Sequence, residues 1–174
     1  KLRDYDEPTP YQPTAAFACH AKPEELCHGW AVVHTTRGHE FDLLGSGPVS
    51  LGPSLPWHRD FKTGREWPLR YCRDIEYLEL DRSSDVKVPW ELSRAQHLTT
   101  IGQAYWLTRD ERYPREFVAQ VDDWIARNPL GYGVNWACAM DVALRAVSWM
   151  WGFYLMGAST ACADADFRRR ARHH

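Results

Sequence analysis

The stretch DVKVPWELSR, residues 85–94, marks where the chain turns from loop-like sequence to helical sequence. Pro89 suits the first turn of a helix, where a missing N–H costs nothing. Glu91 and Arg94 lie three positions apart, so they share one face of that helix. The stretch therefore predicts a helix that presents an aromatic, an acid and a guanidinium close to its start.

A second stretch has the same character. Asn135 and Trp136 lead into a helical pattern that carries Asp141 and Arg145. Two helices that each begin with an aromatic and carry an inward Arg predict a cleft for a long, polar, ring-bearing ligand.

Apolar spacing predicts four helices. The first covers roughly residues 90–107 and the second, amphipathic, roughly 112–127. The third covers roughly 136–156 and is apolar on nearly every face, which predicts burial on all sides. A fourth begins near Asp164. Upstream, residues 40–56 are expected to form a short β-hairpin around Gly45–Pro48.

Outer amphipathic helices that alternate with enclosed inner ones build either a solenoid or a closed α/α toroid. No repeat of fixed period is visible, which disfavours a regular solenoid. The predicted fold is mainly α: an incomplete α/α toroid of helical hairpins over residues 40–174, preceded by an irregular segment, residues 1–39. The basic run at residues 168–174 has no closing signal, so we expect the chain to be part of a longer protein.

Composition excludes several classes of protein. The 174 residues carry a net charge of −2, which gives no field for nucleic acid. No stretch resembles a membrane span or a secretory signal, although the compartment and the oligomeric state stay open. Five cysteines are an odd number and argue against a disulfide framework. Cys19 and Cys27 lie too far apart for a zinc knuckle, so neither a metal nor a cofactor is predicted.

Nine tryptophans exceed what a minimal core needs, so some are expected to line a groove. Trp57–Pro68 mixes aromatics with charges of both signs. It is either a binding loop or a connector whose Trp57 and Trp67 enter the core. We interpret four others as core residues: Trp106, Trp124, Trp149 and Trp151. Cys138 is predicted to lie inside the third helix.

Several motifs, in order, resemble the N-terminal region of heparinase II/III family proteins. They are Trp57–Asp60, Gly64–Pro68, Asp85–Arg94, Ala104–Thr108, Trp124–Ile125 with Asn128–Pro129, and Gly133–Trp136 through Ala143–Ala146. The likeness covers about residues 40–156; residues 1–40 do not share it.

The resemblance implies an α/α toroid that continues into an antiparallel β-sandwich. It also implies a polysaccharide lyase that cleaves acidic glycans, such as heparan sulfate or alginate-like uronates, by β-elimination. Family members are often periplasmic or secreted. In the family an Asn-His pair, a Tyr and a further His carry the chemistry, and no Asn-His dipeptide occurs in this chain. The catalytic residues are therefore unknown and expected beyond His174, so the chain alone should be inactive.

The candidate substrate-binding residues are Trp90, Glu91, Arg94, Asn135, Trp136 and Arg145. A guanidinium matches carboxylate and sulfate geometry. The alternative is that Arg94 pairs with Glu91, and Arg145 with Asp141, along their own helices. Trp90 and Trp136 either stack on sugar rings or pack in the core.

Two further residues have competing interpretations. Asn135 is better placed to cap the third helix than to bind sugar. His97 is expected to be a hydrogen-bonded inner residue rather than a base.

Two other functions stay open. A glycoside hydrolase needs two flanking carboxylic acids, and Glu91 and Asp141, the inner-helix acids, both have Arg neighbours that would keep them ionised. A non-catalytic glycan-binding or exopolysaccharide-assembly module would need no catalytic residues. Which glycan is bound, and whether sulfate is recognised, are beyond the sequence.

Overall fold

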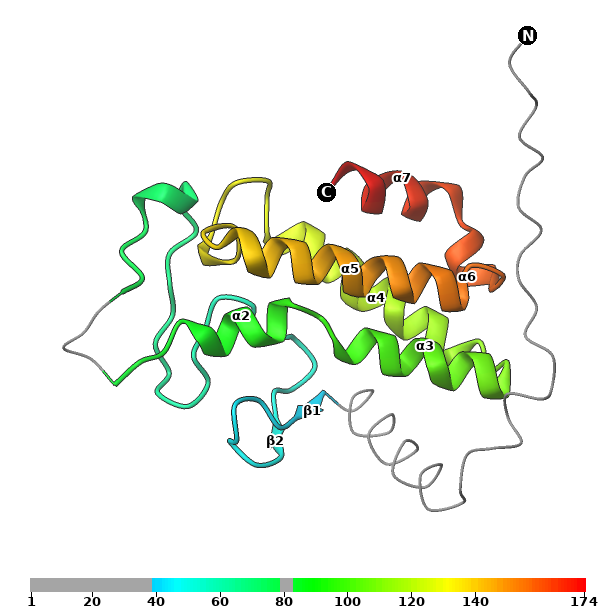
Figure 1. Ribbon diagram of the computed structural model, residues 1–174, viewed down its shortest axis with the longest axis horizontal. Helices are drawn as coiled ribbons and strands as arrows, with labels where there is room; N and C mark the ends of the chain where they lie inside the picture. Colours follow the sequence, from blue (N-terminus) through cyan, green and yellow to red (C-terminus); the bar gives the residue numbers. More distant parts are fainter. Residues whose placement is uncertain (1–38, 79–82) are drawn as a thin grey trace, which may run out of the picture.

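The computed structural model describes residues 39–78 and 83–174, and this part of the protein is mainly helical, as predicted (Figure 1). Two short strands, β1 (Glu40–Phe41) and β2 (Val49–Ser50), are followed by the 3₁₀ turn η2 (Cys72–Asp74). The helical part comprises α2 (Lys87–Ser93), α3 (His97–Thr108), α4 (Arg112–Arg127), the 3₁₀ turn η3 (Val134–Trp136), α5 (Ala139–Met156), α6 (Thr160–Ala163) and α7 (Ala165–His173).

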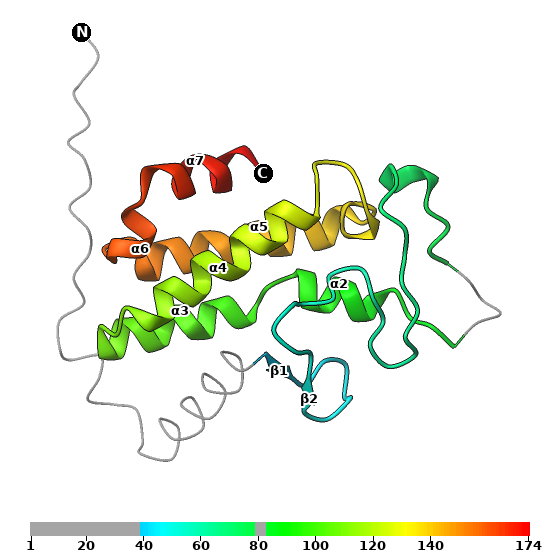
Figure 2. The ribbon, with the colours of Figure 1, turned by 180° about the vertical axis from the view of Figure 1, so that it is seen from behind.

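Three long helices form the centre of the molecule. Helix α3 packs against both α4 and α5, and α7 lies along α4 (Figure 1; Figure 2, from behind). The predicted apolar stripe of α4 is confirmed: Phe117, Val121 and Trp124 are almost completely buried. Helices approach closely where glycine faces a large side chain, as Gly102 does with Leu155 and Gly152 with Phe117.

The first predicted helix is in fact two helices. Helix α2 ends at Ser93, Ala95 has a left-handed backbone with φ of 56°, and α3 begins at His97. A left-handed residue cannot continue a right-handed helix, so the chain breaks between them. Pro89 lies in the first turn of α2, as expected, although the helix starts two residues earlier at Lys87.

The third predicted helix differs in its start. Helix α5 begins at Ala139, after η3, and Cys138 is the half-buried, extended residue that precedes it. The prediction that Cys138 lies inside a helix is therefore wrong. The fourth helix is confirmed at α7, where Asp164 accepts a hydrogen bond from the Phe167 amide at 2.7 Å.

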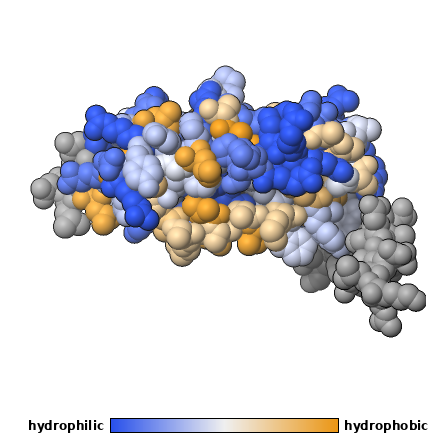
Figure 3. Space-filling view, turned by 90° about the horizontal axis from the view of Figure 1, so that it is seen from above, coloured by the Kyte–Doolittle hydropathy of each residue, from blue (hydrophilic) through white to orange (hydrophobic). Residues whose placement is uncertain are grey.

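Helix α5 is not buried on all sides. In the described part of the chain α5 leaves five large apolar residues exposed: Met140, Val147, Met150, Trp151 and Tyr154. Their spacing places them on one stripe of the helix, on the side that α3 does not cover. Figure 3 shows apolar residues gathered along one edge of the molecule. The interpretation of Trp151 as a core residue is wrong, whereas Trp124 and Trp149 are buried and Trp106 packs against the core.

The segment before α2 is anchored to the helices. The predicted hairpin is confirmed, with Phe41 paired to Val49. Trp57 and Trp67 are buried, as the connector interpretation expects. The Trp57 indole N–H also donates to Asp123 of α4 at 2.7 Å. Asp60 accepts from the Asp85 amide at 3.0 Å, which ties the loop to the residues just before α2.

The remaining predictions concern the N-terminal cysteines, metal binding and a membrane span. Cys19, Cys27 and the rest of residues 1–38 lie outside the described residues. Among residues 39–78 and 83–174 no group of side chains is arranged to hold a metal ion, and no helix there has the length and apolarity to cross a bilayer.

Candidate functional site

Arg94 joins α2 to α5 through two carboxylates. Its Nε donates to Asp141 Oδ1 at 2.5 Å, and its Nη1 donates to Glu91 Oε2. Asp141 is completely buried, while Arg94 and Glu91 keep about a fifth of their side chains exposed. The alternative interpretation, in which Arg94 pairs with Glu91, is thus confirmed. The contact to Asp141 forms where the end of α2, just before the break at Ala95, lies against α5.

Arg145 lies one turn further along α5 in a different environment. Its guanidinium carbon is 4.0 Å from the centroid of the Trp124 ring and 4.9 Å from the centroid of the Trp136 ring, so it lies within cation–π distance of both indoles. Burial lowers the Arg145 pKa to about 10, against the opposing effect of Asp141. The group therefore stays charged at neutral pH.

The alternative interpretation, in which Arg145 pairs with Asp141, is wrong, because Asp141 pairs with Arg94 instead. The Nη1 of Arg145 has two long contacts at 3.4 Å, to Ser93 Oγ and to the Asn135 carbonyl. Ser93, which sequence reasoning missed, also accepts from the Trp124 indole N–H at 2.8 Å. A serine at the end of a helix gives no indication in the sequence that its hydroxyl will contact both a tryptophan and an arginine.

Asn135 does not cap α5. It is completely buried in η3, and its amide nitrogen donates to the Trp57 carbonyl at 2.7 Å and to Asn128 Oδ1 at 2.9 Å. The capping prediction is wrong, because α5 starts four residues later, at Ala139. Asn135 instead fastens η3, which carries Trp136, to the loop before α2.

The two candidate tryptophans lie in different environments. Trp136 is half-buried against Arg145 and Trp124. Trp90 lies in a second apolar cluster, where its indole N–H donates to the Val134 carbonyl at 2.9 Å and its ring meets Tyr77. The structure therefore brings five of the six predicted residues around Arg145 and Arg94, and links Trp90 to them through η3.

Three buried polar atoms of this cluster have no hydrogen-bond partner within the described residues: Asn135 Oδ1, Asp141 Oδ2 and Arg145 Nη2. Buried polar atoms are normally satisfied, so such a concentration is unusual. The cluster therefore has unused hydrogen-bonding capacity, which an ordered water molecule or a polar ligand can satisfy.

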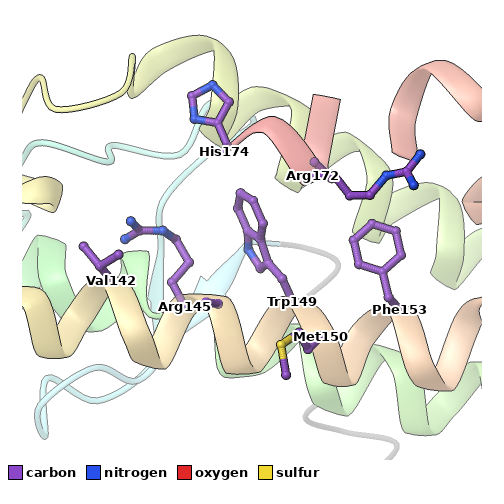
Figure 4. Close-up of a pocket in the computed structure, with 9 residues that line it drawn as sticks. Val142, Arg145, Trp149, Met150, Phe153, Arg172 and His174 are labelled. Atoms are coloured by element: carbon purple, nitrogen blue, oxygen red, sulfur yellow. The ribbon is translucent and has the colours of Figure 1, made fainter. Parts of the chain in front are cut away.

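A pocket of about 270 Å³ opens beside Arg145, between α5 and the end of α7 (Figure 4). Trp149 and Phe153 of α5 and Arg172 and His174 from the C-terminal end line it. Burial, with His173 and Arg145 nearby, lowers the pKa of His174. Sequence reasoning did not find this pocket, because it joins residues from helices that are not sequence neighbours.

His97 is the inner, hydrogen-bonded residue that was expected. Its Nε2 lies 2.7 Å from Gln120 Oε1, and burial lowers its pKa to about 4. It stays neutral at physiological pH and lies half-buried between α3 and α4, beside Phe41.

Comparison with known proteins gives one consistent set of relatives. A family model described as the heparinase II/III N-terminus matches residues 54–159. A heparin-sulfate lyase of Pedobacter heparinus is 30% identical over 101 residues, which are 58% of this chain and 12% of that protein. A heparin-sulfate lyase of Bacteroides stercoris is 29% identical over 110 residues, which are 63% of this chain and 13% of that protein.

The fold has a solved counterpart. The crystal structure of a heparan sulfate lyase HepC mutant from Pedobacter heparinus matches with a TM-score of 0.61 and 24% identity. The match covers 84% of this chain and 21% of that one. The described helices thus have the arrangement found in that structure, and the chain spans about an eighth of the length of the curated relatives.

Proposed function

Because this chain belongs to the heparinase II/III family, we propose that it is the N-terminal helical part of a polysaccharide lyase that cleaves acidic, uronate-containing glycans by β-elimination. The family match over residues 54–159 carries the proposal, since that range contains Arg94, Asp141 and Arg145. The heparin-sulfate lyases among the relatives favour a glycosaminoglycan substrate.

The fold within the whole protein is part of the proposal. Helix α5 packs on α3, contacts α4 through the Phe153–Phe117 and Trp149–Trp124 ring pairs, and leaves an apolar stripe uncovered by the described part of the chain. An α/α toroid that continues beyond this chain would use such a stripe for packing the next inner helix. The incomplete toroid is therefore the architecture that we propose.

We infer a substrate-binding role for this chain. β-Elimination needs a group that neutralises the uronate carboxylate, a base for the C5 proton and an acid for the departing oxygen. Among the six candidates, Arg94, Trp136 and Arg145 are proposed to meet the substrate. Glu91 orients Arg94, and the buried Asn135 and the N–H-bonded Trp90 hold the site in place.

A hydrolase fits the site less well. Hydrolysis needs one carboxyl that protonates the leaving oxygen and a second that acts on the opposite face of the sugar. Glu91 and Asp141 instead share the guanidinium of Arg94. Neither is therefore free to act as that acid.

The test is a panel of glycans offered to the whole protein that contains this chain. Heparan sulfate, heparin and alginate are incubated separately, and ultraviolet absorbance follows the unsaturated uronate that only elimination produces. We expect a rise in absorbance with at least one uronate-containing glycan and none with a neutral glucan. Saturated products would show a hydrolase, and binding without any product would show a glycan-binding module.

A further inference from the structure

Four polar side chains connect the β1–β2 hairpin to α4 and α3 in one hydrogen-bonded network. Nε2 of His39, just before β1, lies 3.2 Å from Glu116 Oε1 of α4. The same oxygen accepts from Gln120 Nε2 at 2.7 Å, and Gln120 Oε1 in turn lies 2.7 Å from His97 Nε2 of α3. His39 and Glu116 keep about a fifth of their side chains exposed, and Gln120 is buried. The network is therefore largely shielded from water.

The partners of His39 fix where its protons lie. Its Nδ1 is 2.7 Å from the Gly52 carbonyl, which can only accept, so Nδ1 carries a hydrogen. The ionised Glu116 carboxylate also only accepts, so Nε2 must carry a hydrogen as well for its contact to be a hydrogen bond. Both nitrogens carry hydrogens only in the imidazolium. A neutral His39 keeps its proton on Nδ1 and turns a lone pair toward the carboxylate, so the contact with α4 exists only in the charged form.

The other end of the network needs no charge. Because the Glu116 carboxylate only accepts, the Gln120 amide must direct its NH₂ group toward it and its oxygen toward His97. A neutral His97 with its hydrogen on Nε2 satisfies that oxygen. A positive charge on His39 also disfavours a second one on His97. The protonation of His39 alone therefore decides whether the hairpin end of the network is formed.

The charges around His39 favour its protonated form. The hydrogen bond with Glu116 raises the pKa of His39, and this effect outweighs the opposing effect of burial. Asp123, also on α4, adds attraction, while His97 on α3 is neutral and adds no repulsion. His39 therefore holds its proton in the folded chain at a pH where an exposed histidine has lost it.

We propose that the His39–Glu116 contact is a pH-dependent clasp, in which protonated His39 holds the β1–β2 hairpin against α4 and loss of the proton loosens the hairpin while the helices stay folded. A group that gains a partner on folding contributes stability that is complete below its unfolded pKa and is lost as pH rises through its folded pKa. The clasp is therefore closed in mildly acidic solution and opens as the solution becomes alkaline. It lies where residues 1–38 join the described region, so it controls how firmly that junction is held.

The test follows amide hydrogen exchange of the full chain by mass spectrometry, from roughly pH 6 to roughly pH 8.5, with each rate corrected for the intrinsic effect of pH. His97 stays neutral throughout this range. The reporter is the peptide that contains Leu51, whose amide donates to the His39 carbonyl at 2.8 Å. A peptide from the buried part of α4, residues 117–124, reports any change in global stability.

Three variants separate the clasp from other effects. His39→Gln removes the titrating group, and Glu116→Gln removes the charge that favours the imidazolium. His58→Gln is the matched control: His58 is another half-buried histidine in the next loop, but its Nε2 lies 3.1 Å from the Arg127 carbonyl instead of a carboxylate.

We expect protection of the Leu51 peptide, relative to the α4 peptide, to fall roughly threefold or more as pH rises across this range. The fall should be absent in His39→Gln and Glu116→Gln and unchanged in His58→Gln. An NMR titration of the unmodified chain should give His39 a pKa above the ordinary 6.5.

The clasp would be overturned by constant protection of the Leu51 peptide, by an equal fall in His39→Gln, or by an equal fall in the α4 peptide. A His39 ring that titrates at or below 6.5 would overturn it as well, and this measurement needs no variant to fold. None of these results bears on whether the whole protein forms unsaturated product.

Discussion

At the scale of single residues, Asp141 positions Arg94, because the two side chains form an ion pair between α5 and the end of α2. Asp141→Asn keeps the shape of the side chain and removes its charge. Since the carboxylate is buried and bonded to a guanidinium, we expect the free energy of unfolding to fall by about 2–3 kcal/mol. Urea denaturation of the purified chain measures this difference.

The matched control for that change is Asp166→Asn. Asp166 also pairs with an arginine, Arg169, but both side chains are mostly exposed. Its loss should change stability by less than about 0.5 kcal/mol. If the two variants lose the same stability, the Arg94–Asp141 contact does not hold the helices together.

His97 predicts a dependence of stability on pH. Burial holds its pKa at about 4 in the folded chain, against 6.5 when unfolded. The unfolded chain therefore binds the proton first, and stability falls as pH drops from 6.5 toward 4, by up to roughly 3 kcal/mol. His97→Gln should flatten this fall in urea titrations at several pH values. The hydrogen bond with Glu116 raises the pKa of His39, so the folded chain binds this proton more tightly and gains stability as pH falls. The effect of His39 on stability is therefore opposite in sign to that of His97. An unchanged slope in His97→Gln would contradict the assignment.

Local pairings at this scale could be predicted from sequence, and long-range ones could not. The three-residue spacing of Glu91 and Arg94 correctly indicated their contact. The same rule failed for Asp141 and Arg145, because Arg94 arrives from a different helix and takes the carboxylate. Nothing in the spacing shows that competition. The pocket beside Arg145 could not be predicted either, because its lining residues come from different helices.

At the scale of elements, periodicity located helices better than it located their ends. Helix α4 was predicted at its observed bounds, because its apolar stripe is regular and its ends are clear. The break at Ala95 could not be seen, since no Gly or Pro marks the left-handed residue. The apolar composition of α5 predicted full burial, but a stripe of Met, Val, Trp and Tyr lies exposed. The composition of α5 alone does not show which helices pack against it.

The contact between α4 and α5 makes a prediction for Gly152. A methyl group added there would lie 2.3 Å from a carbon of the buried Phe117 ring. Gly152→Ala should therefore lower the free energy of unfolding by about 1–3 kcal/mol, despite the better helix propensity of alanine. Thermal unfolding measures the change. Ala143→Ser, on the exposed side of α5, should change stability by less than about 0.5 kcal/mol. A Gly152→Ala variant as stable as the parent would show that α4 and α5 do not pack this closely.

At the scale of the whole molecule, we propose that the chain supplies part of a substrate-binding site rather than a complete reaction centre. In this proposal, Arg94, Arg145 and the aromatic residues around them hold an acidic glycan. The Asn-His pair that the family uses is absent from the 174 residues. Binding and chemistry are therefore proposed to lie on different segments of a longer lyase.

One side-by-side assay tests this division most directly. The 174-residue chain and the whole protein that contains it are each incubated with heparan sulfate, heparin and alginate in turn, and unsaturated uronate is measured by ultraviolet absorbance. We predict product from the whole protein and none from the chain, while calorimetry detects glycan binding to both. Unsaturated product from the chain alone, or none from the whole protein with any uronate-containing glycan, would contradict the account.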